Sequence, residues 1–203
     1  MPEEKVSYYE DFNEIEKKLW KLLTEAVKDR NSEFRTPIFI CGNDKDLDGR
    51  VVVLRKADQK NNFIQFHSDI RSAKVKKIKK NPSCSILFYG KKEKIQLRLK
   101  TECEVNFNNE ITKESWKKTG HVSRKCYLVT NGPGTISKKP TSGLNGKFDN
   151  FDFTKEESEE GYKNFSVIKC KIKSIEWLYL AAKGHRRALI NLGGSKKFTW
   201  LVP

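Results

Sequence analysis

The residues with the clearest chemical potential are cations and hydroxyls that recur between positions 50 and 98. Arg50 and Arg55 flank a run of apolar residues, and Ser68, Ser72 and Lys74 follow soon after. Guanidinium, ammonium and hydroxyl groups bind phosphate through charge-assisted hydrogen bonds. This grouping is compatible with a site for a phosphorylated ligand. The alternative, that Arg50 and Lys74 merely face water, stays open on residue chemistry alone.

Lys74 stands at an unusual place for a cation. Asp69 can cap a short helix over residues 71–80, and Asn81-Pro82 stops it, so Lys74 falls in the first turn. A cation there opposes the helix dipole, whereas an anion bound at the same end is stabilised. A phosphate bound at this end of the helix would form an ion pair with Lys74 and so offset the unfavourable interaction with the dipole.

The elements that must position these groups are mainly short strands. Apolar residues at helical spacing predict a helix over residues 12–29. Apolar runs and turn residues predict strands at 37–41, 50–55, 63–67, 83–89, 95–105, 166–173 and 198–202, of which 95–105 alternates strictly. Between the strands at 95–105 and 166–173, a helix is expected at 111–119, an extended loop after it, and a capping box at Thr154–Glu157.

This order of elements predicts a mainly β, α+β fold. Many short antiparallel strands need closure or cover at their edges, which favours a closed or half-closed β-barrel with peripheral helices. We expect one domain over residues 1–203. Within it, residues 1–35 form an N-terminal helical segment, and residues 108–164 form an irregular lid or interface segment.

Hydrolytic and metal-dependent machinery is not evident in the sequence. The three histidines, His67, His121 and His185, have no paired metal spacing, and no nucleophile elbow, P-loop or G-x-G-x-x-G occurs. The five cysteines include no C-x-x-C pair, so we predict no metal site and expect reduced, mostly buried thiols. Any catalysis would then depend on a cofactor.

The net charge of +15 comes from lysines scattered over nearly every segment, so we interpret most of them as solvated surface and expect no nucleic-acid partner. No apolar stretch is long enough to span a bilayer, and the polar N-terminus does not resemble a signal peptide. We expect a cytoplasmic protein without a membrane partner.

Several segments, in order, resemble the FMN-binding split barrels of the pyridoxamine 5′-phosphate oxidase family. Residues 50–55 are similar to its Arg-x-Val-Leu-Leu-Lys strand, and residues 66–74 to Phe-Tyr-Thr-Asn-x-x-Ser-Arg-Lys. Residues 81–89 resemble Asn-Pro followed by Leu-Leu-Phe-Tyr, and residues 96–98 resemble Gln-Val-Arg. Near the C-terminus, residues 175–177, 185–187 and 200–203 resemble further family motifs.

The resemblance implies an FMN site, a homodimer and a small, anionic substrate. Arg50, Ser68 and Lys74 would hold the phosphate, while Gln96 and backbone groups would fix the flavin ring. Trp177 and Arg187 would complete the site across the dimer interface. The full implied FMN set is Arg50, Val51, Val52, Val53, Leu54, Arg55, His67, Ser68, Ser72, Ala73, Lys74, Gln96, Trp177 and Arg187, and substrate contacts fall to Arg55, Lys183 and His185.

Departures from the family pattern affect the expected activity. Ala73 replaces a phosphate-binding arginine, and His67 replaces a tyrosine. The family's substrate-binding Tyr, Arg and Ser fall around Trp116, Gly120 and Arg124, which do not match. We therefore expect a divergent FMN-dependent oxidoreductase that transfers hydride from an unidentified substrate to flavin. A true pyridoxamine phosphate oxidase and a non-catalytic flavin or haem storage module remain the alternatives.

Overall fold

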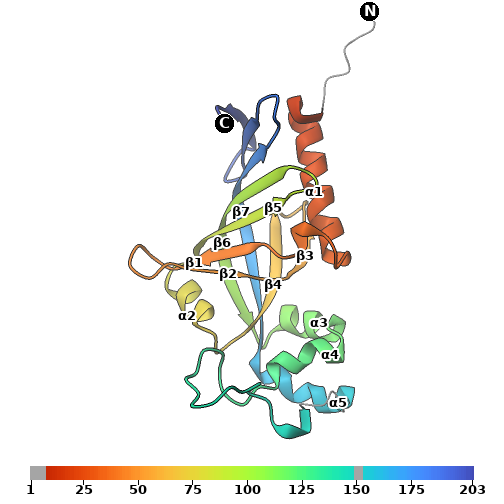
Figure 1. Ribbon diagram of the computed structural model, residues 1–203, viewed down its shortest axis with the longest axis vertical. Helices are drawn as coiled ribbons and strands as arrows, with labels where there is room; N and C mark the ends of the chain where they lie inside the picture. The colour runs from red at the N-terminus through yellow and green to blue at the C-terminus, as the bar shows by residue number, and fades with distance from the viewer. Residues whose placement is uncertain (1–7, 149–152) are drawn as a thin grey trace, which may run out of the picture.

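The computed structural model of the chain describes residues 8–148 and 153–203. The parts of the predicted N-terminal and 108–164 segments at residues 1–7 and 149–152 lie outside the described residues. Nine described strands form one antiparallel sheet, in the order β2-β1-β5-β6-β7-β4-β3, with β8 and β9 added beside β7 (Figure 1). The strands are β1 (Ile38–Cys41), β2 (Asp48–Val51), β3 (Leu54–Asp58), β4 (Phe63–Asp69), β5 (Ser83–Gly90), β6 (Ile95–Phe107), β7 (Phe165–Tyr179), β8 (Arg186–Asn191) and β9 (Lys197–Leu201).

The predicted mainly β, α+β architecture is confirmed, and the sheet is not closed. Strands β2 and β3 stand at opposite ends of the strand order, and no pairing between described residues joins them. The helices lie at the periphery: α1 (Phe12–Lys28), α2 (Ala73–Lys80), α3 (Glu110–Lys118), α4 (His121–Arg124) and α5 (Lys155–Ser158). Short 3₁₀ helices occur at Tyr8–Glu10, Glu33–Arg35, Lys125–Tyr127, Gly146–Phe148 and Glu159–Asn164.

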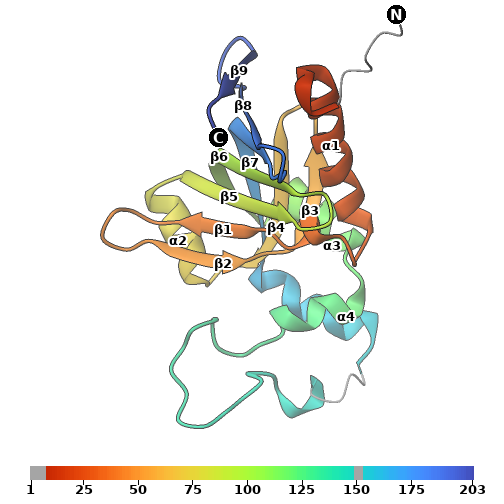
Figure 2. The same cartoon turned by 45° about the horizontal axis from the view of Figure 1, so that its top comes forward.

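Helix α1 packs on the main core beside β3 (Figure 2), and its amphipathic pattern predicts one buried face. Asp11 caps it by accepting a hydrogen bond from the Glu14 N–H at 2.9 Å. Ile15, Leu19 and Leu23 are fully buried in the main core, because apolar residues at this spacing share one helix face. Helix α1 therefore covers one side of the core and contacts β3, and Tyr8, which precedes the helix, packs against the same core.

The predicted strand over residues 50–55 is wrong in one respect, since the chain breaks it into two. β2 ends at Val51 and β3 begins at Leu54, and the Val52 N–H donates to the Pro37 carbonyl at 3.0 Å. The chain must turn here because β2 pairs with β1 while β3 pairs with β4 on the far side of the sheet. Arg50 and Arg55 thus belong to different strands.

Two other boundaries differ from the sequence prediction. Helix α2 begins at Ala73, because the Asp69 carboxylate accepts from the Arg71 N–H at 2.8 Å and holds a turn before the helix. The C-terminal region contains three strands where two were predicted. The additional strand, β8, is a short segment whose apolar residues pair with the extended end of β7.

The described part of the 108–164 segment contains the helix and the capping box that the sequence predicts. The predicted helix at 111–119 is confirmed as α3, and the capping box before α5 has both hydrogen bonds, between Thr154 and Glu157 at 2.9 and 3.2 Å. α3, α4 and α5 gather at the end of the sheet remote from β8 and β9 (Figure 1). None of the described helices combines the length and apolar character needed to cross a membrane.

Candidate functional site

Four side chains that the sequence singled out converge where β4 leads into α2. We call Arg50, Ser68, Ser72 and Lys74 the Lys74 cluster. The Lys74 ammonium donates to Ser68 Oγ at 3.1 Å and to Ser72 Oγ at 3.4 Å, and the two hydroxyls lie 3.0 Å apart. Both serines are buried. The strand end and the helix start therefore bring the predicted phosphate-binding groups together.

The Ser72 side chain does not cap the backbone N–H groups at the start of α2. Ser72 occupies the N-cap position, but its hydroxyl makes no capping hydrogen bond and instead contacts Ser68 and Lys74. The first N–H groups of an α-helix have no partner inside the helix, and they attract anions. The cluster thus combines helix amides, two hydroxyls and a cation at one end of α2.

Arg50 adds a second positive charge to this end of α2. Its guanidinium pairs with Asp48, yet its Nε atom is buried without a partner. Burial lowers the pKa of Lys74, and repulsion from Arg50 lowers it further. Two cations held this close, with a buried donor unused, fit a dianion that would satisfy both.

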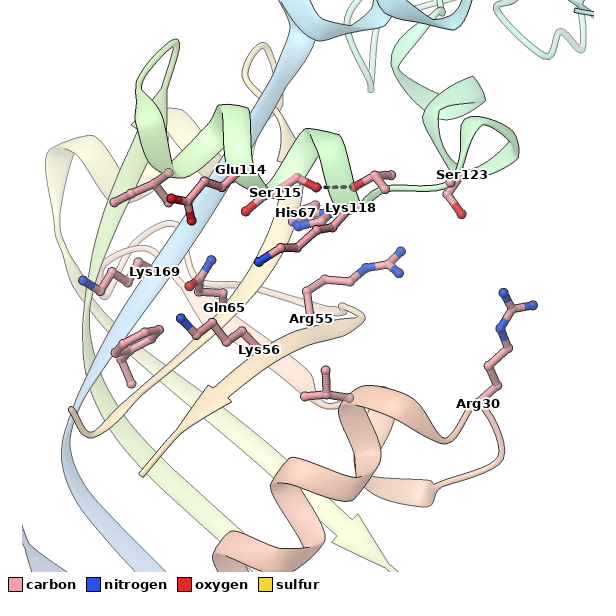
Figure 3. A pocket seen from close by; sticks show the side chains of 15 residues that line it. Arg30, Arg55, Lys56, Gln65, His67, Glu114, Ser115, Lys118, Ser123 and Lys169 are labelled. Atoms are coloured by element: carbon pink, nitrogen blue, oxygen red, sulfur yellow. Dashed lines mark hydrogen bonds between the residues drawn. The ribbon is translucent and has the colours of Figure 1, made fainter. Parts of the chain in front are cut away.

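A second feature is a cavity of about 560 Å³ between the end of α1, β3, β4 and α3, which we call the basic cavity (Figure 3). Arg55 and Lys56, which are neighbours in β3, both line it. They can do so because the register between β3 and β4 shifts between Leu54 and Lys56, and a bulge redirects side chains that would otherwise alternate. The Arg55 Nε atom is buried and without a partner.

His67 also lines the basic cavity. Burial lowers its pKa to about 3, with a smaller contribution from Arg55. The imidazole is therefore neutral at pH 7, and its Nδ1 atom is buried with no partner. Such a ring can donate or accept one hydrogen bond from a bound molecule but adds no charge.

The remaining predicted cofactor residues divide between two faces of the sheet. Val51 is exposed, whereas Val52 and Leu54 point into the core and Val53 is partly buried. Gln96 and Arg187 lie on the outward face, where Arg187 pairs with Glu176 at 2.9 Å. Ala73 is exposed at the first position of α2.

Trp177 points the other way, into the main core. Its side chain is fully buried and stacks on Tyr179, with ring centroids 6.2 Å apart. Its strand partner, Leu97, is also fully buried, because directly opposed residues share a sheet face. The structure therefore does not bring Trp177 together with Gln96 and Arg187, and its indole Nε1 is a buried donor without a partner.

The predicted substrate residues lie apart in a single chain. Lys183 and His185 are exposed in the turn between β7 and β8, where His185 Nδ1 accepts from the Ala181 N–H at 3.1 Å. That turn adjoins the start of α1, through the ion pair of Arg186 with Glu10. Arg55 lies near the other end of α1, whose length is about 25 Å. One chain alone cannot place the three side chains on one small molecule.

The positions of the family's substrate-binding residues offer no such contacts here. Gly120 lines the basic cavity without a side chain. Arg124 is buried beside Trp116, where it stacks on the indole at 4.4 Å, pairs with Glu159 and donates to backbone carbonyls. It holds α3, α4 and α5 together and does not line the cavity.

Sequence reasoning missed four further cations of the basic cavity: Arg30, Lys56, Lys118 and Lys169. They come from the end of α1 and from β3, α3 and β7, and no motif connects them. Lys169 could have been placed only with the register that sets it opposite Gln65.

Comparison with known proteins finds similarity to FMN-binding domains, both in sequence pattern and in fold. Residues 17–106 match the model of the pyridoxamine 5′-phosphate oxidase FMN-binding domain. No curated protein matches the chain.

Solved structures share the fold at low sequence identity. A pyridoxamine 5′-phosphate oxidase-related, FMN-binding protein from Nostoc punctiforme has a TM-score of 0.72 at 16% identity, over 92% of this chain and 96% of its own. PhzG from Burkholderia lata, in complex with tetrahydrophenazine-1-carboxylic acid, has a TM-score of 0.69 at 13% identity, over 96% of each chain. ChuZ from Campylobacter jejuni has a TM-score of 0.55 at 14% identity, over 95% of this chain and 64% of its own.

The matched segment contains the whole Lys74 cluster as well as Arg55, His67 and Gln96. The motif order and the family model make residues 17–106 similar to the pyridoxamine 5′-phosphate oxidase FMN-binding domain, and the chain has the split-barrel fold of the FMN-binding protein from Nostoc punctiforme.

Proposed function

We propose that this protein is an FMN-dependent oxidoreductase that acts on a small anionic substrate. The observation that carries the proposal is the Lys74 cluster, in which two cations and two buried hydroxyls meet at the uncapped start of α2. A phosphate monoester is the group that best uses all of these donors at once. The match of residues 17–106 to an FMN-binding domain supports the same ligand.

The residues present fit an FMN molecule oriented from this cluster. Lys74, Arg50 and the α2 amides would hold the phosphate, and the segment from Val51 to Arg55 would run beside the flavin ring. Arg55 would place a cation near the ring, and the neutral His67 would supply one hydrogen bond without charge. The chemistry that bound FMN supplies is acceptance of hydride from the substrate, followed by reoxidation by oxygen or another acceptor.

A homodimer would complete the site. Ile38, Val51 and Tyr89 are 41%, 64% and 50% exposed on the outward face of the sheet, which is the face that carries Gln96 and Arg187. Exposed apolar groups of this size commonly mark an interface. We infer that two copies pack through this face, so that Gln96 and Arg187 of one chain approach the flavin held by the other.

The test is a binding titration of the purified protein with FMN and, in parallel, with riboflavin, which lacks the phosphate. We expect flavin absorbance to co-purify or to be restored by FMN, with riboflavin bound at least tenfold more weakly. Equal affinity for the two would refute the role of the Lys74 cluster, and no binding of either would refute the flavoprotein assignment.

Turnover separates the oxidoreductase from a storage module. Reduction of bound flavin by a small anionic substrate under anaerobic conditions is the expected result. A flavin that stays oxidised with every candidate substrate, while binding tightly, would favour storage. A Soret band in the purified protein would favour the haem alternative.

A further inference from the structure

The basic cavity has an unusual charge balance. Five of its lining residues are cations (Arg30, Arg55, Lys56, Lys118 and Lys169), and the single carboxylate among the described lining residues is Glu114. No ion pair within the described part of the chain involves Arg30, Arg55, Lys118 or Lys169, and Lys56 approaches Asp58 only at 3.9 Å. Positive charges gathered around the basic cavity raise its affinity for anions.

The cations come from separate elements and face the same space. Lys56 and Lys169 both lie over the Phe63 ring, at 5.0 and 4.7 Å from its centroid. Figure 3 shows Lys118 reaching down from α3 between Lys56 and Arg55. The cavity therefore presents positive charge at the Phe63 end and again toward Arg55, with Lys118 between.

Polar atoms without partners add hydrogen-bonding capacity to the charged lining of the cavity. His67 Nδ1 and Arg55 Nε are buried without partners, and Gln65 lines the cavity beside its cross-strand neighbour Lys169. Buried polar atoms that lack a partner cost free energy until a ligand or water satisfies them. The Phe63 ring, which both ammonium groups approach, contributes an apolar group to the lining.

We propose that the basic cavity binds a small organic anion with at least two negatively charged groups, one held by Lys56 and Lys169 and the other by Arg55 and Lys118. A polycarboxylate or a phosphorylated carboxylic acid has this chemistry. The volume of about 560 Å³ is within the usual range for small-molecule sites. Because Arg55 would also adjoin the flavin ring, the identity of this anion as the substrate depends on the proposed function above.

The test is isothermal titration of the full-length protein, with and without FMN, at one fixed ionic strength. Citrate represents the polycarboxylates, phosphoglycolate the phosphorylated acids, and acetate the singly charged control. We expect citrate or phosphoglycolate to bind at least tenfold more tightly than acetate. Acetate binding as tightly as both, or binding of none of the three, would overturn the inference.

Variants locate the bound anion. Lys118→Gln and Lys169→Gln should each weaken binding of the tighter anion about tenfold, whereas Lys80→Gln, an exposed residue of α2 outside the cavity, should leave it unchanged. An equal loss in all three variants would mean attraction by net charge alone and would contradict a site.

The same preparations distinguish the two proposals. FMN affinity should be retained in Lys118→Gln and Lys169→Gln, since neither belongs to the Lys74 cluster. Protein that binds FMN but no multiply charged anion would overturn only the inference about the cavity. Protein that binds such an anion in the cavity but no FMN would overturn only the proposed function.

Discussion

Replacement of Lys74 by glutamine should separate ligand binding from folding. The Lys74 ammonium lies 3.1 Å from Ser68 Oγ and 3.4 Å from Ser72 Oγ, and its pKa is lowered by burial and by Arg50. The charge is thus unfavourable in the ligand-free protein. It should become favourable only when a phosphate dianion is added.

The expected magnitude follows from that contrast. A hydrogen bond to a charged group contributes about 1.5–3 kcal/mol, so Lys74→Gln should weaken FMN binding roughly 10- to 150-fold. The glutamine removes a buried cation beside Arg50, so the free energy of unfolding without FMN should be unchanged or slightly higher. A residue with only a structural role would behave differently, because its loss would lower the free energy of unfolding as well as the FMN affinity.

Two measurements check this prediction: quenching of FMN fluorescence at fixed salt, and thermal unfolding of the FMN-free protein. Lys79→Gln, an exposed lysine on the same helix, is the matched control and should change neither. Unchanged FMN affinity in Lys74→Gln would refute the phosphate role. A fall in stability without FMN that matches the fall in affinity would show that Lys74 is only a structural residue.

Three other predictions concern pH, the α3–α5 segment and the dimer. The pKa of His67 is about 3 in the folded protein and near 6.5 in the unfolded chain, so the unfolded chain gains a proton first as pH falls. The free energy of unfolding should therefore drop by about 2 kcal/mol between pH 7 and pH 5. Urea titrations should show this drop and a smaller one in His67→Gln, and equal drops in the two proteins would contradict the prediction. Arg124→Met should lower the free energy of unfolding in urea by about 2–4 kcal/mol, because it leaves Glu159 and two carbonyls without their charged donor. A decrease below about 1 kcal/mol would show that these hydrogen bonds contribute little to stability. Val51→Glu should shift the protein from dimer to monomer in analytical ultracentrifugation, with Lys79→Gln unchanged, and a dimer that survives the substitution would place the interface elsewhere.

Local patterns were enough to predict most of the elements. The alternation of residues 95–105 corresponds to β6, and the helical spacing of residues 12–29 corresponds to α1. These features depend on near neighbours in sequence, so periodicity and capping chemistry reveal them. The break at Val52 and Val53 was not predicted, because its cause is the pairing of β2 and β3 with different strands.

The same division applies to the orientation of single residues. Trp177 and Gln96 both matched family motifs, yet they lie on opposite faces of the sheet. Arg124 falls near the family's substrate-binding positions in sequence, and it is buried against Trp116 and Glu159. Which face a side chain takes depends on register and on the partners packed against it, and neither is local.

By itself, the sequence determined that Ser68, Ser72 and Lys74 meet, because they lie within one strand end and one helix turn, where short-range geometry brings them together. Arg50 joins them from β2 and therefore depends on the tertiary structure. The tertiary structure decided the basic cavity. Its cations come from the turn after α1 and from β3, α3 and β7, and they meet only because β4 pairs with β7 and a bulge turns Arg55 and Lys56 toward the same space. Side chains that far apart in the chain can converge only through the packing of the whole fold.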